Sequence, residues 1–309
     1  MDRFQAMQVF VRIVETNSLR RAADTLNLPA SSVTTVLQGL EKELGTQLMQ
    51  RTTRRLSLTS DGEVYLEHAR RVLDDMAAME ASFATKGLPS GRLKVDVTMS
   101  IGRQLLIPNL PAFQAAFPQI TLVLNLGDRL ADVVEEGLSC AIRTGEIEDS
   151  ATLIARPLGA FRWQTCASPA YLEAHGQPAD VSDLARHRCI GYANSRTGRI
   201  MDWRFLDENG ERHHTPEGSL YVNDAESYAA CGARGLGIAQ AGTYLFQPFI
   251  ERGELVPILE QYSSKPIPVS MVYAQHRRLS PVVRTFYDWM RGVFDASDLF
   301  ERQSTPADR

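Results

Sequence analysis

The chain has 309 residues, of which 44% are hydrophobic and 23% charged, and its formal net charge is −4. This composition is typical of a globular protein with two or three compact units, and no apolar run approaches the ~18 residues that a membrane-spanning helix requires. The four cysteines are widely spaced without a C-x-x-C pair, so neither a zinc site nor a disulfide framework is indicated.

The net charge conceals a division along the chain. Residues 1–60 contain eight Lys and Arg against five Asp and Glu, whereas the remainder is mildly acidic. A basic N-terminal segment of this kind favours local contact with nucleic acid over general binding to polyanions. Because the N-terminus opens a helix and has no signal-peptide pattern, we expect a cytoplasmic protein with no membrane partner.

The first 45 residues predict three helices. Residues 2–15 carry apolar residues at helical spacing, and Ser18 is suited to cap a second helix that ends at Asn27. Pro29 then opens a third helix, which Gly45 ends. One face of the third helix is apolar, and its other face is small and polar, with Ser31, Ser32, Thr34, Thr35 and Gln38. Such a pair of helices joined by a tight turn is typical of a helix-turn-helix, although an ordinary helical hairpin remains the alternative.

A basic hairpin follows the third helix. Residues 48–58 have strand-like ends around a polar middle, and residues 45–60 contain Arg51, Arg54 and Arg55 but no acid. Uncompensated arginines at a hairpin tip are suited to binding phosphates or to entering a minor groove. A solvated charge run is the alternative, and the single sign of the charges argues against it.

A long helix is predicted from Thr59, its N-cap, to about residue 85. Its apolar residues alternate spacings of four and three, the pattern of a coiled-coil seam: Tyr65, Ala69, Val72, Met76, Met79 and Phe83. We therefore expect this helix to pair with a second copy of itself, the alternative being that it folds onto its own domain. Residues 86–91 then break the helix and mark a domain boundary.

From Arg92 onward, strands alternate with helices, which predicts an α/β domain. Strands are expected at residues 93–97, 122–126 and 140–142, with Ser100 capping one helix and Asp128 starting another over residues 129–136. Helix N-termini then meet at one edge of the sheet, where small ligands and especially anions bind.

The chain is expected to leave this sheet near residues 160–163 for a second lobe and to return with a strand at 266–273 and a helix at 281–294. We interpret residues 232–237 as a tight turn between a helix and a strand, because no dinucleotide motif is completed there. His213 and His214 are interpreted as loop residues and not metal ligands, and the cysteines as buried free thiols. The polar tail at 301–309 is expected to be disordered.

Several of these residues carry a resemblance to a known family. The run from Phe10 to Gly62, including Ala22-Ala23, Leu44-Gly45 and residues 51–59, resembles the winged helix-turn-helix of the LysR-type transcriptional regulators. Residues 168–172, 183–187 and 235–239 are similar to the two-lobed, periplasmic-binding-protein-like (type II) effector domain of that family. The resemblance departs at Ala30 and Thr35, where members often carry Arg and a basic or amide residue. The sequence preference on DNA is therefore not carried over.

The resemblance implies an α/β protein overall, with an all-α winged helix-turn-helix at 1–59, a linker and dimerisation helix with hinge at 60–90, and an effector-binding domain at 91–300. Lobe I would comprise about 91–161 and 268–300, and lobe II about 162–267. The implied function is a sequence-specific regulator that binds double-stranded DNA as a homodimer or homotetramer and responds to a small-molecule effector, an organic anion being one candidate class. A redox-sensing cysteine pair stays open, because the family includes such sensors.

The resemblance also assigns site residues. The polar face of the third helix would contact base edges, and Arg51, Arg54 and Arg55 would hold phosphates. The family's cleft maps onto Thr98, Ser100, Asp128, Asn194, Ser195 and Asn223. An enzyme is the competing class, but the motifs of hydrolases, NTPases and metalloproteases are lacking, and no cofactor or metal is indicated. A small-molecule carrier would leave the first 90 residues unexplained.

Overall fold

The computed structural model describes residues 2–51, 56–83, 89–127, 132–133, 135–147, 152–194, 197–208, 210–262, 264–275 and 280–302. The chain forms two compact units, Met1–Gly87 and Leu88–Arg309, which are described separately. In the part of the chain described, no helix is both long enough and apolar enough to cross a membrane.

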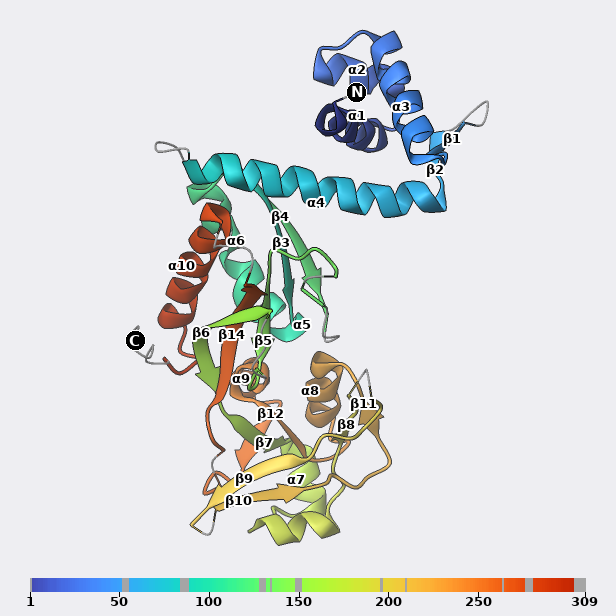
Figure 1. Ribbon diagram of the computed structural model, residues 1–309. Helices are drawn as coiled ribbons and strands as arrows, with labels where there is room; N and C mark the ends of the chain where they lie inside the picture. Colours follow the sequence, from blue (N-terminus) through green and yellow to red (C-terminus); the bar gives the residue numbers. More distant parts are fainter. Residues whose placement is uncertain are drawn as a thin grey trace. The chain divides into compact units, whose positions relative to one another are not determined.

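The described residues of the first unit form four helices and one hairpin (Figure 1). Its elements are α1 (Arg3–Thr16), α2 (Leu19–Leu26), α3 (Ala30–Leu44), β1 (Met49–Arg51), β2 (Leu56–Leu58) and α4 (Ser60–Phe83). The predicted caps are confirmed, because the Ser18 side chain accepts from the Arg21 amide, and both Asn27 and Gly45 have left-handed φ angles, of 54° and 73°. Thr59 caps α4 by accepting from the Gly62 amide at 2.9 Å.

The core of this unit lies between the apolar faces of α1, α2, α3 and the first half of α4. Phe10 and Ile13 of α1 and Val33 of α3 are completely buried in it. Phe10 also contacts Tyr65 of α4 edge to face, with ring centroids 5.4 Å apart. The three predicted helices therefore share one core, and α4 is a fourth member of it.

This packing corrects part of the predicted dimerisation stripe. Ala69 is 1% exposed within the unit's own core, so it cannot contact a second copy, and Tyr65 is half-buried against Phe10. Val72 and Met79 are 41% and 50% exposed, and Val64, which the coiled-coil pattern omitted, is 58% exposed. The heptad pattern failed here because it merged two helix faces, one for this core and one for solvent. The side chain of Phe83 lies outside the described residues.

Gly62 allows α4 to approach the start of the hairpin closely. A β-carbon at this position would lie 2.0 Å from the Leu48 carbonyl oxygen and 3.1 Å from Leu58 Cδ2. We expect Gly62→Ala to destabilise the first unit, because overpacking costs about 1–3 kcal/mol and exceeds the ~1 kcal/mol that alanine gains in a helix.

Urea unfolding followed by circular dichroism measures this change. The matched control is Gly292→Ala in the helix Pro281–Ala296, where the new methyl group would meet nothing within 4 Å and should be neutral or stabilising. Equal effects at the two glycines would contradict the close approach at Leu48.

Lobe I of the second unit is built on a five-stranded sheet of order β4-β3-β5-β14-β6. Its strands are β3 (Gly91–Val97), β4 (Ile120–Leu126), β5 (Cys140–Thr144), β6 (Leu153–Phe161) and β14 (Ile267–Ala274). β3 is parallel to β4 and β5, whereas β14 is antiparallel to β5 and β6. Strands β3 and β5 are buried on both faces, as expected for parallel strands covered by helices.

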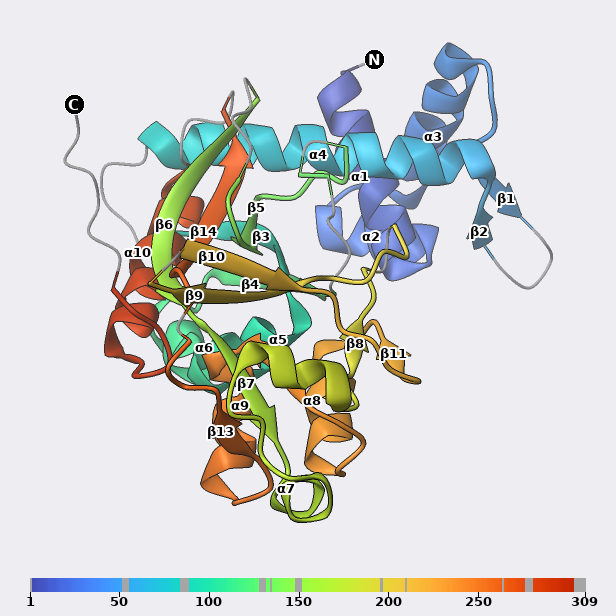
Figure 2. The same cartoon turned by 90° about the horizontal axis from the view of Figure 1, so that it is seen from below.

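Helices cover this sheet. A continuous helical stretch comprises α5 (Met99–Ile101), the π-helical turn η1 (Gly102–Leu106) and α6 (Ile107–Ala116), and the last long helix is α10 (Pro281–Ala296). Phe113 of α6 contacts Phe286 and Trp289 of α10, with centroid distances of 5.6 and 4.7 Å. Both views show α6 and α10 side by side (Figures 1 and 2).

Lobe II contains the three-stranded sheet β12-β7-β13, all of it antiparallel. Besides these strands, the lobe contains two two-stranded pairs, β9 with β10 and β8 with β11. The strands of the lobe are β7 (Trp163–Ala167), β8 (Gly191–Tyr192), β9 (Trp203–Asp207), β10 (Gly210–His214), β11 (Tyr221–Val222), β12 (Ala239–Gly242) and β13 (Val256–Ile258). Its helices are α7 (Pro169–His175), η2 (Val181–Arg186), α8 (Ala225–Ala233) and α9 (Thr243–Glu251). The stretch 232–237 is the predicted turn between a helix and a strand, with Gly235 at φ 74°.

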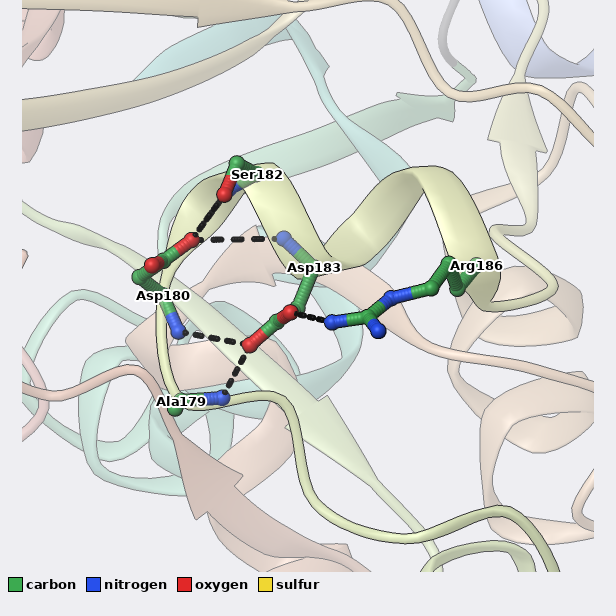
Figure 3. Close-up of polar contacts among 5 residues, drawn as sticks. All are labelled: Ala179, Asp180, Ser182, Asp183 and Arg186. Atoms are coloured by element: carbon green, nitrogen blue, oxygen red, sulfur yellow. Dashed lines mark hydrogen bonds and ion pairs between the residues drawn. The ribbon is translucent and has the colours of Figure 1, made fainter.

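A capping box fixes the start of η2 (Figure 3). The Asp180 carboxylate accepts from the amides of Ser182 and Asp183, and the Asp183 carboxylate accepts in return from the amide of Asp180. The hydroxyl of Ser182 also donates to Asp180 and, as the largest contribution, lowers the pKa of that carboxyl. Asp183 forms an ion pair with Arg186 one turn later. These four residues fix the start of η2 through local hydrogen bonds and one ion pair.

Two crossings join the lobes within this unit. Strand β6 continues directly into β7 near Phe161–Trp163, as Figure 2 shows, and the chain returns between β13 and β14. The predicted exit at residues 160–163 therefore matches the observed strands.

The C-terminus differs from the prediction at its first residue. Glu301 was expected to begin a disordered tail, but it pairs with Ala160 through two backbone hydrogen bonds of 2.7 and 2.9 Å and forms an ion pair with Arg162. The preceding Phe300 is buried against Tyr244. The polar composition of the tail concealed this short antiparallel pairing. Residues 303–309 lie outside the described residues.

Three further expectations of local structure are corrected. In the expected helix 129–136, the described residues form one turn that Gly137 ends at φ 60°, and Asp128 lies outside the described residues. Thr98, not Ser100, is the N-cap of α5. His213 and His214 lie in strand β10 and not in a loop, because the β9–β10 hairpin has polar outer positions that hide its strand pattern.

Candidate functional site

The first candidate surface is the polar face of α3. Ser31, Thr35 and Gln38 are exposed there, whereas Val33 and Leu37 on the opposite face are buried. Ser32 and Thr34 are half-buried at the edges of this face. The sequence prediction that these five side chains share one outward surface is thus consistent with the helix as folded.

The threonines on this face have defined hydrogen-bonding capacity. The hydroxyl of Thr34 donates to the Ala30 carbonyl at 3.2 Å, and that of Thr35 donates to the Ser31 carbonyl at 2.9 Å. Because each hydroxyl proton is used within the helix, the outward lone pairs of these oxygens are left as acceptors. In a major groove they suit the amino groups of adenine and cytosine, while the Gln38 amide can both donate and accept.

The hairpin beside α3 is held by a carboxylate that sequence reasoning missed. Glu41 Oε1 of α3 accepts from the backbone amides of Leu48 and Met49, at 2.9 and 3.1 Å. These two bonds attach the base of the hairpin to the helix, and β1 then pairs with β2 in the register Met49–Leu58. Of the three predicted phosphate-binding arginines, Arg51 ends β1, while Arg54 and Arg55 lie outside the described residues.

The second candidate site is a cavity of about 540 Å³ between the two lobes of the second unit. It is lined by the end of β3, the end of β5, the β6–β7 crossing, β9, α8, β12 and α9. Among the predicted effector residues, Thr98, Ser100 and Asn194 line it. Asn223 does not line it and instead accepts a hydrogen bond from Tyr192 through its carbonyl oxygen, and Asp128 and Ser195 lie outside the described residues.

Ser100 has a different environment from the one predicted. It is 3% exposed, and its hydroxyl is hydrogen-bonded to the Tyr244 hydroxyl at 3.1 Å. This bond joins α5 of lobe I to α9, which follows the second lobe's strand β12. Ser100 therefore acts on the cavity through Tyr244 as well as directly.

The cavity floor also holds a buried ion pair that the sequence analysis did not name. Arg143 of β5 donates to Asp96 of β3 at 2.7 Å, and the two residues are 8% and 5% exposed. A charged residue in an otherwise apolar central strand was the available signal, since such charges are buried only when paired. Arg143 lines the cavity, whereas Asp96 lies behind it.

The cysteines match the interpretation as buried thiols in part. All four are free, and Cys140, Cys166 and Cys189 are buried. Burial raises the pKa of Cys140 and of Cys189 to about 12 and raises that of Cys166 as well. These three thiols stay protonated near neutral pH and are poor nucleophiles. Cys231, on α8, is half-buried. In the described part of the chain, no group of His, Cys, Asp and Glu is arranged to hold a metal ion.

Comparison with known proteins gives concordant results for both units. Residues 4–63 match the model of the bacterial regulatory helix-turn-helix proteins of the lysR family, and residues 86–295 match the LysR substrate binding domain. The chain is 37% identical over 294 residues to the HTH-type transcriptional regulator YhjC of Escherichia coli, covering 95% of this chain and 98% of that protein. It is 36% identical over 309 residues to the HTH-type transcriptional repressor PA14_22550 of Pseudomonas aeruginosa, covering 99% and 96%.

A solved structure agrees with these matches. CrgA, a LysR-type transcriptional regulator from Neisseria meningitidis, superposes with a TM-score of 0.61 at 32% identity, covering 94% of this chain and 98% of that one.

Proposed function

The chain belongs to the LysR family of bacterial regulatory helix-turn-helix proteins, and on that basis we propose which of its residues bind DNA, the effector and a second copy. It is a DNA-binding transcriptional regulator with an effector-binding domain, and not an enzyme. We infer that it acts in the cytoplasm, because it must reach chromosomal DNA. The domain limits that we adopt are 1–59, 60–90 and 91–300.

Base recognition is assigned to Ser31, Ser32, Thr34, Thr35 and Gln38. The observation that carries this assignment is the exposure of Thr35 and Gln38 on a helix whose other face is buried. A helix held in this way can enter a major groove without losing its packing. Glu41 supports the assignment indirectly, because it fixes the hairpin against the same helix.

Phosphate binding is assigned to Arg51, Arg54 and Arg55. We expect Arg54→Ala with Arg55→Ala to lower the magnitude of the salt slope of DNA binding by ~1.8 per subunit. Each phosphate contact contributes about 0.9 to the slope through the counterions that it releases, and this variant loses two contacts per subunit. Fluorescence anisotropy with a fixed duplex at several salt concentrations measures the slope. The matched control is Arg186→Ala with Arg252→Ala, two exposed arginines of the second unit. An unchanged slope in the Arg54 and Arg55 variant would refute the assignment.

Self-association is assigned to the exposed face of α4. Val64, Val72 and Met79 present apolar surface there, and Met76 is half-buried beside them. Pairing with a second copy along this face would bring two α3 helices to a separation of about 34 Å, or a multiple of it, so that each could enter its own major groove on one side of the DNA. This surface serves a homodimer, and a homotetramer would need a further interface on the second unit.

Effector binding is assigned to the cavity between the lobes. Thr98, Ser100 and Asn194 line it, and Asp128 and Ser195 follow the lining residues Gly127 and Asn194 in the sequence. A cavity of about 540 Å³ falls in the range of ~300–1,000 Å³ that small-molecule sites occupy. Because the cavity is bounded by both lobes, a bound molecule would alter the free-energy balance between lobe arrangements and hence DNA binding.

A further inference from the structure

The effector cavity is strongly aromatic. Six of its lining residues are Phe, Tyr or Trp: Phe161, Trp163, Tyr192, Trp203, Tyr228 and Tyr244. Phe161 contacts both Trp163 and Tyr244 edge to face, with centroid distances of 5.5 and 5.1 Å, and Tyr192 contacts Tyr228 at 5.7 Å. Such a wall favours a flat ring, which can stack on one aromatic face or meet another at its edge.

Two polar side chains of the wall, those of Gln240 and Tyr228, already form hydrogen bonds within the protein. Gln240 accepts from the Arg204 amide at 2.8 Å and donates to the Arg204 carbonyl and to Thr165, both at 3.1 Å. The Tyr228 hydroxyl donates a hydrogen bond to the Ile190 carbonyl and accepts one from the backbone amide of Gln240, both at 3.0 Å. A ligand would have to break these bonds to use the same groups, which makes them poor contacts for a polar molecule.

The charge at the cavity floor is also neutralised. The guanidinium of Arg143 is paired with the buried carboxylate of Asp96 at 2.7 Å, so the floor presents no net positive charge to a ligand. At the rim, Arg204 is exposed and Asp202 supplies the opposite charge, with the exposed His213 beside them. For an anion buried against a floor without net positive charge, the desolvation penalty exceeds the electrostatic attraction that the anion gains.

Two buried polar atoms of the cavity lining remain without a partner among the described residues. They are the Trp163 indole nitrogen and the Thr98 hydroxyl oxygen, and both residues line the cavity. The indole N–H can only donate, whereas the hydroxyl can donate or accept. Buried polar atoms are normally satisfied, so these two are the positions where a ligand gains most by supplying hydrogen-bonding groups.

From these four observations we propose that the cavity takes an uncharged ring compound bearing a carbonyl oxygen, such as a ketone, ester or amide. The ring lies among the aromatic side chains, and the carbonyl oxygen accepts from Trp163 Nε1 and Thr98 Oγ1. This proposal rests on the proposed function, since it identifies the class of effector for the cavity already assigned. It departs from the organic anion that helix N-termini at a sheet edge suggested.

Matched compounds test the proposal. One-ring and two-ring scaffolds (benzene, naphthalene and indole) are each supplied as the primary amide, the carboxylate and the methyl derivative, and binding to the full-length protein is measured by calorimetry and thermal shift. The amides are expected to bind most tightly. Thr98→Val removes one polar group with little change of shape, whereas Trp163→Phe removes the indole N–H together with part of the ring. In each variant the loss of one hydrogen bond should weaken amide binding about fivefold to tenfold relative to binding of the methyl derivative.

The methyl derivatives serve as the internal control. Their binding should be unchanged in Thr98→Val, and in Trp163→Phe it measures the effect of the smaller ring alone. The proposal is overturned by tighter binding of the carboxylates, by unchanged amide affinity in Trp163→Phe, or by the absence of any amide that binds. Specific DNA binding by the same wild-type preparation is measured in parallel. If DNA binding is specific and the ligand results are negative, the ligand class is wrong and the regulator assignment stands; if specific DNA binding is absent, the proposed function itself fails.

Discussion

The double substitution Thr35→Ala with Gln38→Ala is expected to abolish sequence-selective DNA binding while leaving non-selective binding intact. Both side chains are exposed on α3, and neither packs in the core, so the fold should be retained. A bidentate contact from a side chain to a base edge contributes about 1–3 kcal/mol of discrimination. If one such contact is counted for each of the two subunits on a symmetric site, the affinity for the operator should fall by roughly 30-fold to 10⁴-fold.

The same experiment separates base contacts from phosphate contacts. Affinity for random DNA and its salt slope should be unchanged in the Thr35 and Gln38 variant, because the arginines of the hairpin are retained. Gln8→Ala on the exposed side of α1 is the matched control, since it also removes an exposed amide from a helix of the same unit. If selectivity survives the double substitution, α3 does not recognise bases.

The second large effect is expected at the ion pair beneath the effector cavity. Asp96→Ala leaves the guanidinium of Arg143, which is 8% exposed, without the carboxylate that it binds at 2.7 Å. Removing one partner of a buried pair costs about 3–5 kcal/mol. In a unit of this size such a loss lowers the midpoint of thermal unfolding by roughly 6–20 °C, which scanning calorimetry measures.

Two further variants show whether the cost comes from the stranded charge. Glu254→Ala breaks the exposed pair with Arg252 and should change the unfolding midpoint very little, because solvent screens it. Asp96→Leu combined with Arg143→Met removes both charges and should recover most of the stability lost in Asp96→Ala. If Asp96→Ala unfolds at the same temperature as the parent, the pair is not buried as described.

The first unit was largely predictable because its signals are local. Ser18, Asn27 and Gly45 mark helix ends by backbone chemistry that needs no distant partner, and the structure places each of them at a cap. The division of α4 between two faces was not predictable in the same way. Its apolar residues match the spacing of a single coiled-coil seam in the sequence. In the structure, however, Ala69 is buried in a core that includes residues more than 50 positions earlier, such as Phe10.

The second unit shows where local patterns fail. Strands β3, β5 and β14 are apolar runs and were found, whereas the β9–β10 hairpin exposes Arg204, Glu211 and His213 and was missed. The pairing of Glu301 with Ala160 depends on residues about 140 positions apart, which no window of sequence reveals.

The effector cavity was predicted only in part, for a similar reason. Thr98 and Ser100 follow a strand and were found by position. Trp163, Gln240 and Tyr244 come from β7, β12 and α9, which meet only when strands far apart in the sequence pair within the second lobe, and their sequence contexts look like ordinary core. The neutralisation of Arg143 by Asp96 likewise depends on the pairing of β3 with β5.

The central claim is that this chain recognises particular DNA sequences. The most direct measurement is capture and sequencing of genomic DNA fragments by the purified full-length protein at moderate salt. We predict enrichment of a small number of sites with dyad symmetry, whose half-sites are separated by about one helical turn or a multiple of it. Uniform, salt-sensitive enrichment across the genome would contradict the claim, because phosphate contacts alone produce that result.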